Sequence, residues 1–242
     1  MVLEAPFGPA TIEDCYDIAR LFKIASGGVA EYTWTTMQAD YPGLSPIEIG
    51  ERRYASDKTV FTYKNSIVAS QDDQVMGVLV TFPIADEVDE PSETPDSMAR
   101  IVPTIPLHFR RPWRSDGGGT TAGMQELEQR REQLPRTASG TAVEDRVLAP
   151  YSLEAPGSWY ICAMALFPEF RGQGLGTKLL AIARSQAQDR GFNELSLLAF
   201  EQNTGAVRFY ERNGFKTVDR TTVVPHELIQ YTGDVLLMTA PV

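Results

Sequence analysis

The stretch "FPEFRGQGLGTKLLAIARSQAQDRG" (residues 167–191) places three glycines within five positions, directly before an apolar pattern of helical period. Glycine lowers the stability of a helix start, so their presence needs a physical reason. The apolar run "WYICAMALF" (residues 159–167) precedes the glycines and is typical of a strand buried on both faces. A second such run, "NELSLLAF" (residues 193–200), follows the helix. This order predicts a mixed α/β sheet with a crossover connection.

Three phosphate-binding patterns can explain the glycines. A Walker-type loop needs a lysine directly after a glycine, and Lys178 does not follow one. A dinucleotide fingerprint needs a third glycine where the chain has Leu179. The pattern Arg-x-x-Gly-x-Gly is met by Arg171, Gly174 and Gly176. Glycines let the backbone approach a pyrophosphate, and the N–H groups of a helix start hold an anion. The alternative is a glycine-rich turn without a ligand.

This stretch resembles the acetyl-CoA-binding motif of the GCN5-related N-acetyltransferase (GNAT) family. A second block, "EQNTGAVRFYERNGF" (residues 201–215), resembles the family pattern Asn-x-x-Ala-x-x-aromatic-Tyr-x-x-x-Gly-Phe. The matching residues are Asn203, Ala206, Phe209, Tyr210, Gly214 and Phe215. The resemblance covers residues 158–224 and, more narrowly, extends to a bacterial subgroup of poorly assigned acetyltransferases.

The resemblance implies an α+β fold with a mixed, mostly antiparallel central sheet flanked by helices, whose fourth and fifth strands splay apart. We expect one domain over residues 1–242, with an insertion at about residues 85–157 between the third and fourth strands. The insertion begins with an acidic, proline-punctuated stretch, continues through a basic and aromatic one into a glycine-rich linker, and includes a short run of helical composition at residues 124–134. The other expected elements are a helix from Thr11 to Gly27, a loop across Glu31 and Trp34, a helix after Ser45, a hairpin of strands 59–70 and 74–83, and two last strands.

Acetyl-CoA is the cosubstrate that the resemblance implies. Main-chain groups of the fourth strand would pair with its pantetheine arm, and the glycine bend would hold its pyrophosphate. The expected cofactor-binding residues are Ala165, Leu166, Phe167, Arg171, Gly172, Gln173, Gly174, Leu175, Gly176, Thr177, Asn203, Ala206 and Phe209.

The implied chemistry is direct attack of an acceptor amine on the thioester. Tyr210 matches the position that donates a proton to the departing thiolate, and a phenol of pKa about 10 suits a thiol of about 8.5. Glu31 and Glu201 are the candidate bases, with His226 and His108 as weaker ones. Two other functions stay open: a non-catalytic acetyl-CoA-binding sensor or scaffold, and a nucleotide-binding α/β domain.

Composition narrows the classes of molecule that this protein is expected to bind. The net charge of −10 argues against nucleic acid, and no apolar run approaches the ~20 residues of a membrane span. The start of the chain lacks a signal-peptide pattern, so we expect a cytoplasmic protein acting on a small-molecule or protein amine. Cys15 and Cys162 lack metal-ligand spacing, so no metal site is expected, and both are predicted to be buried. Pairing through the last strand offers a route to a homodimer.

Overall fold

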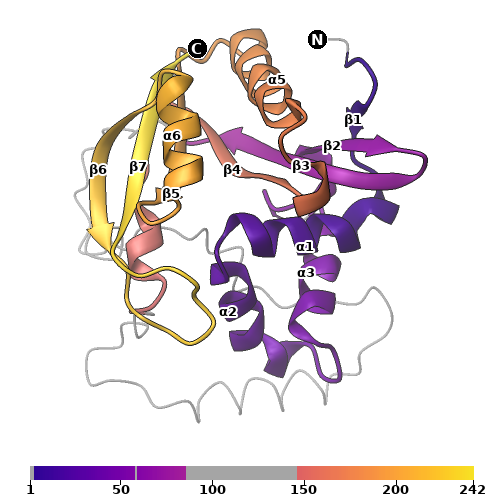
Figure 1. The fold of residues 1–242 in the computed structure, drawn as a ribbon. Coiled ribbons are helices and arrows are strands. Elements are labelled where there is room, and N and C mark those ends of the chain that lie inside the picture. Colours follow the sequence, from indigo (N-terminus) through magenta and orange to yellow (C-terminus); the bar gives the residue numbers. More distant parts are fainter. Residues whose placement is uncertain (1–2, 58, 86–145) are drawn as a thin grey trace, which may run out of the picture.

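The computed structural model describes residues 3–57, 59–85 and 146–242 (Figure 1). Its strands are β1 (Phe7–Pro9), β2 (Ser66–Gln71), β3 (Gln74–Pro83), β4 (Trp159–Leu166), β5 (Glu194–Phe200), β6 (Lys216–Thr222) and β7 (Asp234–Pro241). Its α-helices are α1 (Cys15–Ala25), α2 (Val29–Thr36), α3 (Pro46–Tyr54), α5 (Leu175–Asp189) and α6 (Thr204–Arg212). Short 3-10 helices are η1 (Ile12–Asp14), η2 (Gln38–Asp40), η3 (Tyr63–Asn65), η6 (Ala149–Ser152) and η7 (Pro168–Phe170).

The seven strands form one sheet in the order β1-β2-β3-β4-β5-β7-β6. Every neighbouring pair is antiparallel except β4 and β5, which are parallel. Helix α5 makes the crossover between these two strands, because a parallel pair cannot be joined by a tight turn. The predicted mixed, mostly antiparallel sheet with a crossover is confirmed.

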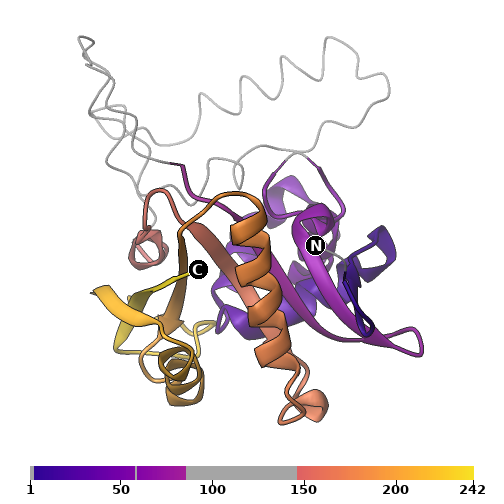
Figure 2. The same ribbon diagram turned by 90° about the horizontal axis from the view of Figure 1, so that it is seen from above.

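Helices cover both faces of the sheet, with α5 on one side and α1, α2 and α3 on the other (Figure 2). One buried cluster, which we call the α1–α3 cluster, joins Ile18, Trp34 and Ile49 to Val78 and Val80 of β3. The second, the α5 cluster, is built from residues of α5, α6 and the sheet, among them Leu79, Leu179, Leu197, Tyr210 and Met238. Neighbouring strand residues therefore enter opposite clusters, as the two-residue period of a strand requires.

The N-terminal helices differ from expectation at one place. Residues 29–36, predicted as a loop, form α2, which buries Ala30, Thr33 and Trp34. The ring of Trp34 lies so close to Gly50 of α3 that an added Cβ would come within 2.7 Å of it. The mixed polarity of "VAEYTWTT" hid this short helix, whose stability comes from packing against α3 rather than from its own pattern.

The strand boundaries also differ in part. The hairpin is confirmed, but residues 59–65 lie outside strand β2, with η3 at Tyr63–Asn65. Strand β1 was missed because its three residues are too few to show a two-residue period. Strand β4 was expected to be buried on both faces; its residues instead alternate between buried and half-buried.

The last strand has no free edge. Strand β7 pairs with β5 on one side and β6 on the other, so the predicted homodimer cannot form through its edge. The edge strands of the sheet are β1 and β6. A homodimer itself stays a prediction, as does the single domain over residues 1–242.

Most of the predicted insertion, including His108 and the run at residues 124–134, lies outside the described residues. After residue 145 the chain continues through η6 into β4. Of the helices that the structure describes, none combines the length and the apolar character needed to cross a bilayer.

Candidate functional site

The glycine bend, residues 171–176, connects η7 to α5. Gly172 and Gly174 have φ angles of 77° and 79°, in the left-handed region where other residues are strained. A Cβ added to either glycine would meet no described protein atom within 4 Å. Backbone conformation alone therefore accounts for these two glycines.

Gly176 lies in the first turn of α5 and needs a different explanation. A Cβ added there would touch only the Phe209 ring, at 3.9 Å, which is an ordinary contact. Alanine would stabilise this helix by about 1 kcal/mol relative to glycine. Neither strain nor packing among the described residues requires glycine here, so the absent side chain leaves room beside the helix start.

Main-chain N–H groups gather at this helix start. The first hydrogen bond of α5 runs from Lys178 N to Gly174 O, at 3.2 Å. The N–H groups of residues 175–177 therefore have no acceptor within the helix. In the described part of the chain, no protein acceptor bonds the N–H groups of residues 172–177. With the positive end of the helix dipole and the exposed Thr177, they form a place where an anion is favoured.

The side chains of the bend turn away from these N–H groups. Arg171 Nε donates to Leu166 O at 3.2 Å, and Gln173 Nε2 donates to Glu169 O at 3.4 Å. The Leu175 side chain is buried in the protein. The main chain is therefore the part of the bend best placed to bind a ligand.

Strands β4 and β5 pair only where they begin. The register joins Trp159–Ile161 to Leu195–Leu197, and no pairs follow although β4 runs to Leu166 and β5 to Phe200. We call the unpaired parts, residues 162–166 and 198–200, the β4–β5 divergence. The predicted splaying of these two strands is confirmed.

A β-bulge in β4 explains where the divergence begins. Opposite β3, Val80 pairs with Ala163 and Thr81 pairs with Ile161, so Cys162 is an extra residue. A bulge bends its strand and increases the local twist, which turns β4 away from β5. Cys162 and Ala163 consequently both contact the α1–α3 cluster, whereas Ile161 enters the α5 cluster.

The bulge also sets which main-chain groups of β4 face the divergence. Phe167 N donates to Met76 O of β3 at 3.0 Å. Alternate residues of an antiparallel pair turn toward the partner, so Ala165 also faces β3 while Leu166 and Met164 face the divergence. Of Ala165, Leu166 and Phe167, the residues predicted to pair with the pantetheine arm, only Leu166 turns its main-chain groups toward the divergence, and the pairing itself stays a prediction. Met164 was missed, because a bulge that the sequence does not reveal decides which residues of β4 turn toward β3 and which turn toward the divergence.

Helix α6 lies beside the glycine bend, and its start carries the second sequence block. Asn203 Oδ1 accepts a hydrogen bond from Ala206 N at 3.3 Å, so Asn203 caps the helix as predicted and keeps Nδ2 as a donor. Phe209, one turn further on, is the ring nearest Gly176. The two blocks therefore meet in space.

Tyr210 follows Phe209 and is buried in the α5 cluster. Its ring lies 5.4 Å from those of Phe209 and Phe215 in edge-on geometry. Burial raises the pKa of the Tyr210 phenol, because the charged phenolate is disfavoured away from water. The group therefore stays protonated at neutral pH and is available as a donor.

The two carboxylates predicted as bases are both ion-paired. Glu31, in the first turn of α2, lies 2.6 Å from Lys23 Nζ of α1. Glu201, just after β5, lies 3.5 Å from Arg220 of β6 and is half exposed. Because β6 lies beyond β7 from β4, Glu201 points away from the β4–β5 divergence, contrary to expectation.

The weaker candidate His226 lies in the connection between β6 and β7. Its Nδ1 accepts a hydrogen bond from Leu228 N at 3.2 Å, and its ring centre lies 4.6 Å from that of Tyr32. The same connection is joined to the turn between α1 and α2 by a bond from Gln230 N to Gly27 O, at 2.9 Å. These two segments are therefore in direct contact on the α1–α3 side of the sheet.

Cys15 is buried, as predicted, whereas Cys162 is half-buried, contrary to expectation. Burial raises the pKa of Cys15 to about 12 and raises the pKa of Cys162 as well, so neither is a thiolate at neutral pH. Among the described residues, no cluster of histidine, cysteine or carboxylate side chains could hold a metal ion.

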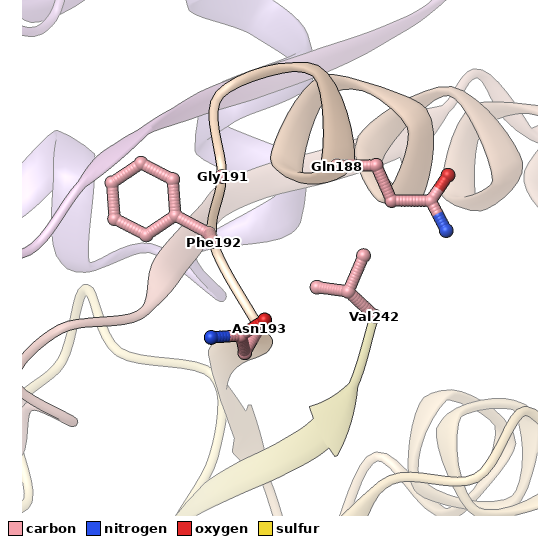
Figure 3. Close-up of a pocket in the computed structure, with 5 residues that line it drawn as sticks. All are labelled: Gln188, Gly191, Phe192, Asn193 and Val242. Atoms are coloured by element: carbon pink, nitrogen blue, oxygen red, sulfur yellow. The ribbon is translucent and has the colours of Figure 1, made fainter.

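A shallow hollow is present at the other end of α5 (Figure 3). It is lined by Gln188, Gly191, Phe192, Asn193 and Val242. Helix α5 has 15 residues, so this hollow lies roughly 20 Å from the glycine bend. It takes no part in the site described above.

Comparison with known proteins agrees with this geometry. Residues 118–215 match the model of the acetyltransferase (GNAT) family. N-alpha-acetyltransferase 30 of Schizosaccharomyces pombe is 41% identical over 56 residues, which are 23% of this chain and 37% of the yeast protein. The chain therefore matches well under half the length of that relative. The predicted bacterial subgroup stays a prediction.

Solved structures share the fold. A crystal structure described as an acetyltransferase has a TM-score of 0.57 and 20% identity, with 98% of each chain covered. An N-acetyltransferase of Staphylococcus aureus Mu50 has a TM-score of 0.53 and 16% identity, covering 97% of this chain and 99% of its own. At these identities the likeness concerns the fold alone.

Proposed function

Because this chain belongs to the acetyltransferase (GNAT) family, we propose that it transfers an acetyl group from acetyl-CoA to an acceptor amine. The transfer takes place by direct attack of the amine in a complex of both substrates. The observation that carries the proposal concerns position 176. The residue there is glycine, which has no side chain, although the described protein atoms would leave room for a Cβ. It lies beside main-chain N–H groups that have no protein acceptor. A ligand that approaches the backbone closely explains this choice.

The residues of the site fit coenzyme A. The N–H groups of residues 172–177 would bind its pyrophosphate, with the Thr177 hydroxyl as a further donor. Leu166 and Met164 would offer main-chain groups to the pantetheine arm, and Asn203 would donate through Nδ2. Acetyl-CoA supplies the activated acetyl thioester. Phe209 and Ala206 would contact it from α6.

Tyr210 is the group that we assign to the departing sulfur. It lies on the α5 side of the sheet, the same side as the glycine bend, and its raised pKa keeps it protonated. A phenol can therefore give its proton to a thiolate as the carbon–sulfur bond breaks. No covalent acyl-protein step is required.

The acceptor is a small-molecule or protein amine. The net charge of −10 favours a cationic acceptor over an anionic one. The yeast relative bears the name of an N-alpha-acetyltransferase, so peptides with a free amino terminus belong among the amines to be tested.

A binding module without catalysis is the second candidate function. The observation in its favour is that Glu31 and Glu201, the two carboxylates expected as bases, are each engaged by a cation. A sensor or scaffold would bind acetyl-CoA through the same N–H groups and release no thiol.

Two measurements separate these functions. Thermal unfolding with acetyl-CoA, ATP or NAD should show stabilisation by acetyl-CoA alone, about 2.7 kcal/mol at 100 times its dissociation constant. Release of free thiol from acetyl-CoA should then occur with members of a panel containing spermidine, an arylamine, an amino acid and a short peptide. Stabilisation without thiol release would favour the module, and stabilisation by ATP or NAD would contradict both.

Gly176→Ala tests the central observation. We expect the free protein to gain up to about 1 kcal/mol of stability while its affinity for acetyl-CoA falls about tenfold. Gly8→Ala in β1, where an added Cβ also meets nothing, is the matched control and should leave the affinity unchanged. Equal affinity in calorimetry for Gly176→Ala and the unmodified protein would refute the placement.

A further inference from the structure

Three side chains in the middle of the sheet are only half-buried. Tyr160 and Cys162 of β4 and Leu198 of β5 keep contact with solvent, although both strands lie inside a seven-stranded sheet with helices on both faces. Cys162 and Leu198 are the first residues after the last β4–β5 pair, which joins Ile161 to Leu197. Solvent therefore reaches the inside of the sheet where the β4–β5 divergence begins.

These three side chains lie on the face of the sheet opposite α5. Tyr160 and Cys162 pack against the α1–α3 cluster. Leu198 lies between Leu197 and Ala199, which both enter the α5 cluster, so it faces the other way. It packs against a separate buried cluster, which we call the Phe200 cluster. The buried members of that cluster are Phe200, Val223, Ile229 and Val235. With coenzyme A held from the α5 side, as proposed above, this face is left for the acceptor amine.

A contact between two loops bounds the far end of the divergence. Gln230 N, in the connection between β6 and β7, donates to Gly27 O, in the turn between α1 and α2, at 2.9 Å. The Tyr231 ring is stacked on that of Phe200, the last residue of β5, with 4.7 Å between the ring centres. A Cβ added to Gly27 would come within 2.7 Å of Tyr231 and 3.0 Å of Phe200. The two loops therefore meet beside the end of β5.

These two limits set the size of the acceptor. The last β4–β5 pair involves Leu197, and the loop contact lies beside Phe200, three residues further along β5. A strand advances about 3.3 Å per residue, so the two limits are roughly 10 Å apart. An extended peptide would place about three residues in this length, and the joined loops lie in the path of the next one. The arrangement favours a small molecule over a protein chain.

The half-buried side chains set the chemistry of the acceptor, because none of them is charged. Leu198 is apolar, and burial raises the pKa of the Tyr160 phenol and of the Cys162 thiol, so both stay neutral. The nearby carboxylate of Glu31 is already 2.6 Å from Lys23 Nζ. An apolar group gains by leaving water here, whereas a second ammonium group would lose its water without gaining an ion pair.

Building on the proposed function, we propose that the acceptor is a small primary amine with an apolar body, an arylalkyl or alkyl group, and that Cys162 and Leu198 select it. The amino group reaches the thioester at the β4–β5 divergence. The apolar body lies between Cys162, on the side of the α1–α3 cluster, and Leu198, on the side of the Phe200 cluster. Both side chains contact the body of the substrate rather than its reacting atoms, so they determine specificity and not chemistry.

Leu198→Asp tests this selection. With phenethylamine we expect kcat/KM to fall about 100-fold, because a carboxylate replaces an apolar contact. With cadaverine, whose second ammonium group can pair with the new carboxylate, the loss should be less than about tenfold. Val218→Asp, at an exposed position of β6, is the matched control and should leave the preference between the two amines unchanged. An equal loss with both amines in Leu198→Asp would give Leu198 a structural role and overturn the proposal.

Two milder variants keep the test valid if Leu198→Asp does not fold. Leu198→Ala should lower kcat/KM about tenfold with phenethylamine, and less than about twofold with ethylamine, which has almost no apolar body. Cys162→Leu, which fills part of the same space, should likewise raise the KM for phenethylamine more than that for ethylamine. Equal effects on the two amines in both variants would contradict the placement.

Binding can be measured without turnover. In protein labelled with carbon-13 at its leucine methyl groups, the Leu198 signals are those that disappear in Leu198→Met. The acetylated product N-phenethylacetamide, added together with coenzyme A, should shift these signals, because its ring would lie against the side chain. Leu198 signals that stay unmoved at saturating product, while other signals shift, would overturn the proposal.

The outcomes distinguish this inference from the proposed function. If the unmodified protein releases thiol with spermidine or a peptide but not with phenethylamine or hexylamine, the inference falls while the acetyltransferase stands. If acetyl-CoA binds but no amine releases thiol, the proposed function falls, and the inference falls with it.

Discussion

The two sides of the central sheet differ in how the chain specifies them. On the α5 side, the glycine bend and the start of α6 meet through Gly176 and Phe209, which are parts of two sequence blocks. On the α1–α3 side, the turn between α1 and α2 and the connection that carries His226 meet through Gln230 and Gly27, and these segments share no sequence pattern. The difference teaches that main-chain groups left free for a ligand are accompanied by a local signature of glycines, whereas side-chain contacts between distant segments leave no such signature. Four predictions test this contrast.

Tyr210→Phe should have the largest effect. Loss of the proton donor should slow turnover about 10³-fold, while the affinity for acetyl-CoA stays within a factor of two or three. Because burial raises the pKa of Tyr210, the rate of the unmodified protein should not fall as pH rises through the ordinary tyrosine range near 10. Steady-state kinetics across pH, with calorimetry for binding, check this. An unaltered rate would remove Tyr210 from the chemistry.

Gly174→Val should have the second largest effect. A branched side chain in the left-handed region at φ 79° would strain the bend and occupy the place assigned to the pyrophosphate. We expect affinity for acetyl-CoA to fall about 100-fold or more. Gly43→Val is the matched control, since Gly43 has φ 84° and equally open surroundings. Similar stability losses in both variants, with an affinity loss only in Gly174→Val, would support the assignment; equal affinities would contradict it.

Gly28→Ala addresses the α1–α3 side. Gly28 has φ 95°, and an added Cβ would come within 1.8 Å of Leu228 O, so the connection between β6 and β7 must move. We expect a loss of about 2 kcal/mol in the free energy of unfolding. Calorimetry should show cofactor affinity unchanged, because the glycine bend lies across the sheet. A weaker affinity for acetyl-CoA would show that the two sides are coupled.

The smallest effect concerns the main chain of β4. Ala165→Pro would remove an N–H that bonds to β3, whereas Met164→Pro would remove one that faces the divergence. Ala165→Pro should therefore lose about 1 kcal/mol more stability than Met164→Pro. Acetyl-CoA affinity should fall more in Met164→Pro. If chemical unfolding shows that Met164→Pro loses more stability than Ala165→Pro, then Met164, and not Ala165, turns its N–H toward β3.

The sequence predicted those features that depend on local patterns. The glycines, the Asn203 cap and the apolar runs before and after α5 each reflect a local physical requirement, and all are found. The helix α2 was missed because Trp34 is stabilised by a contact with Gly50 of another helix.

Long-range features were not predictable in the same way. The phase of β4 depends on a bulge opposite β3, and a single extra residue has no signature in an apolar run. The direction of Glu201 depends on Arg220, which lies on a strand two positions across the sheet. Pairing partners far apart in the sequence decide both, so residue patterns alone give no access to them.

The extra residue at Cys162 makes the length of β4 as important as its composition. With Cys162 removed, the remaining residues of β4 would alternate regularly between the two clusters, and Tyr160 and Ile161 would keep the faces that they have now. The strand would lose its bend and could run straight beside β5. We therefore expect substitutions in this segment to be tolerated far better than insertions or deletions of one residue, which would close the opening between the two strands.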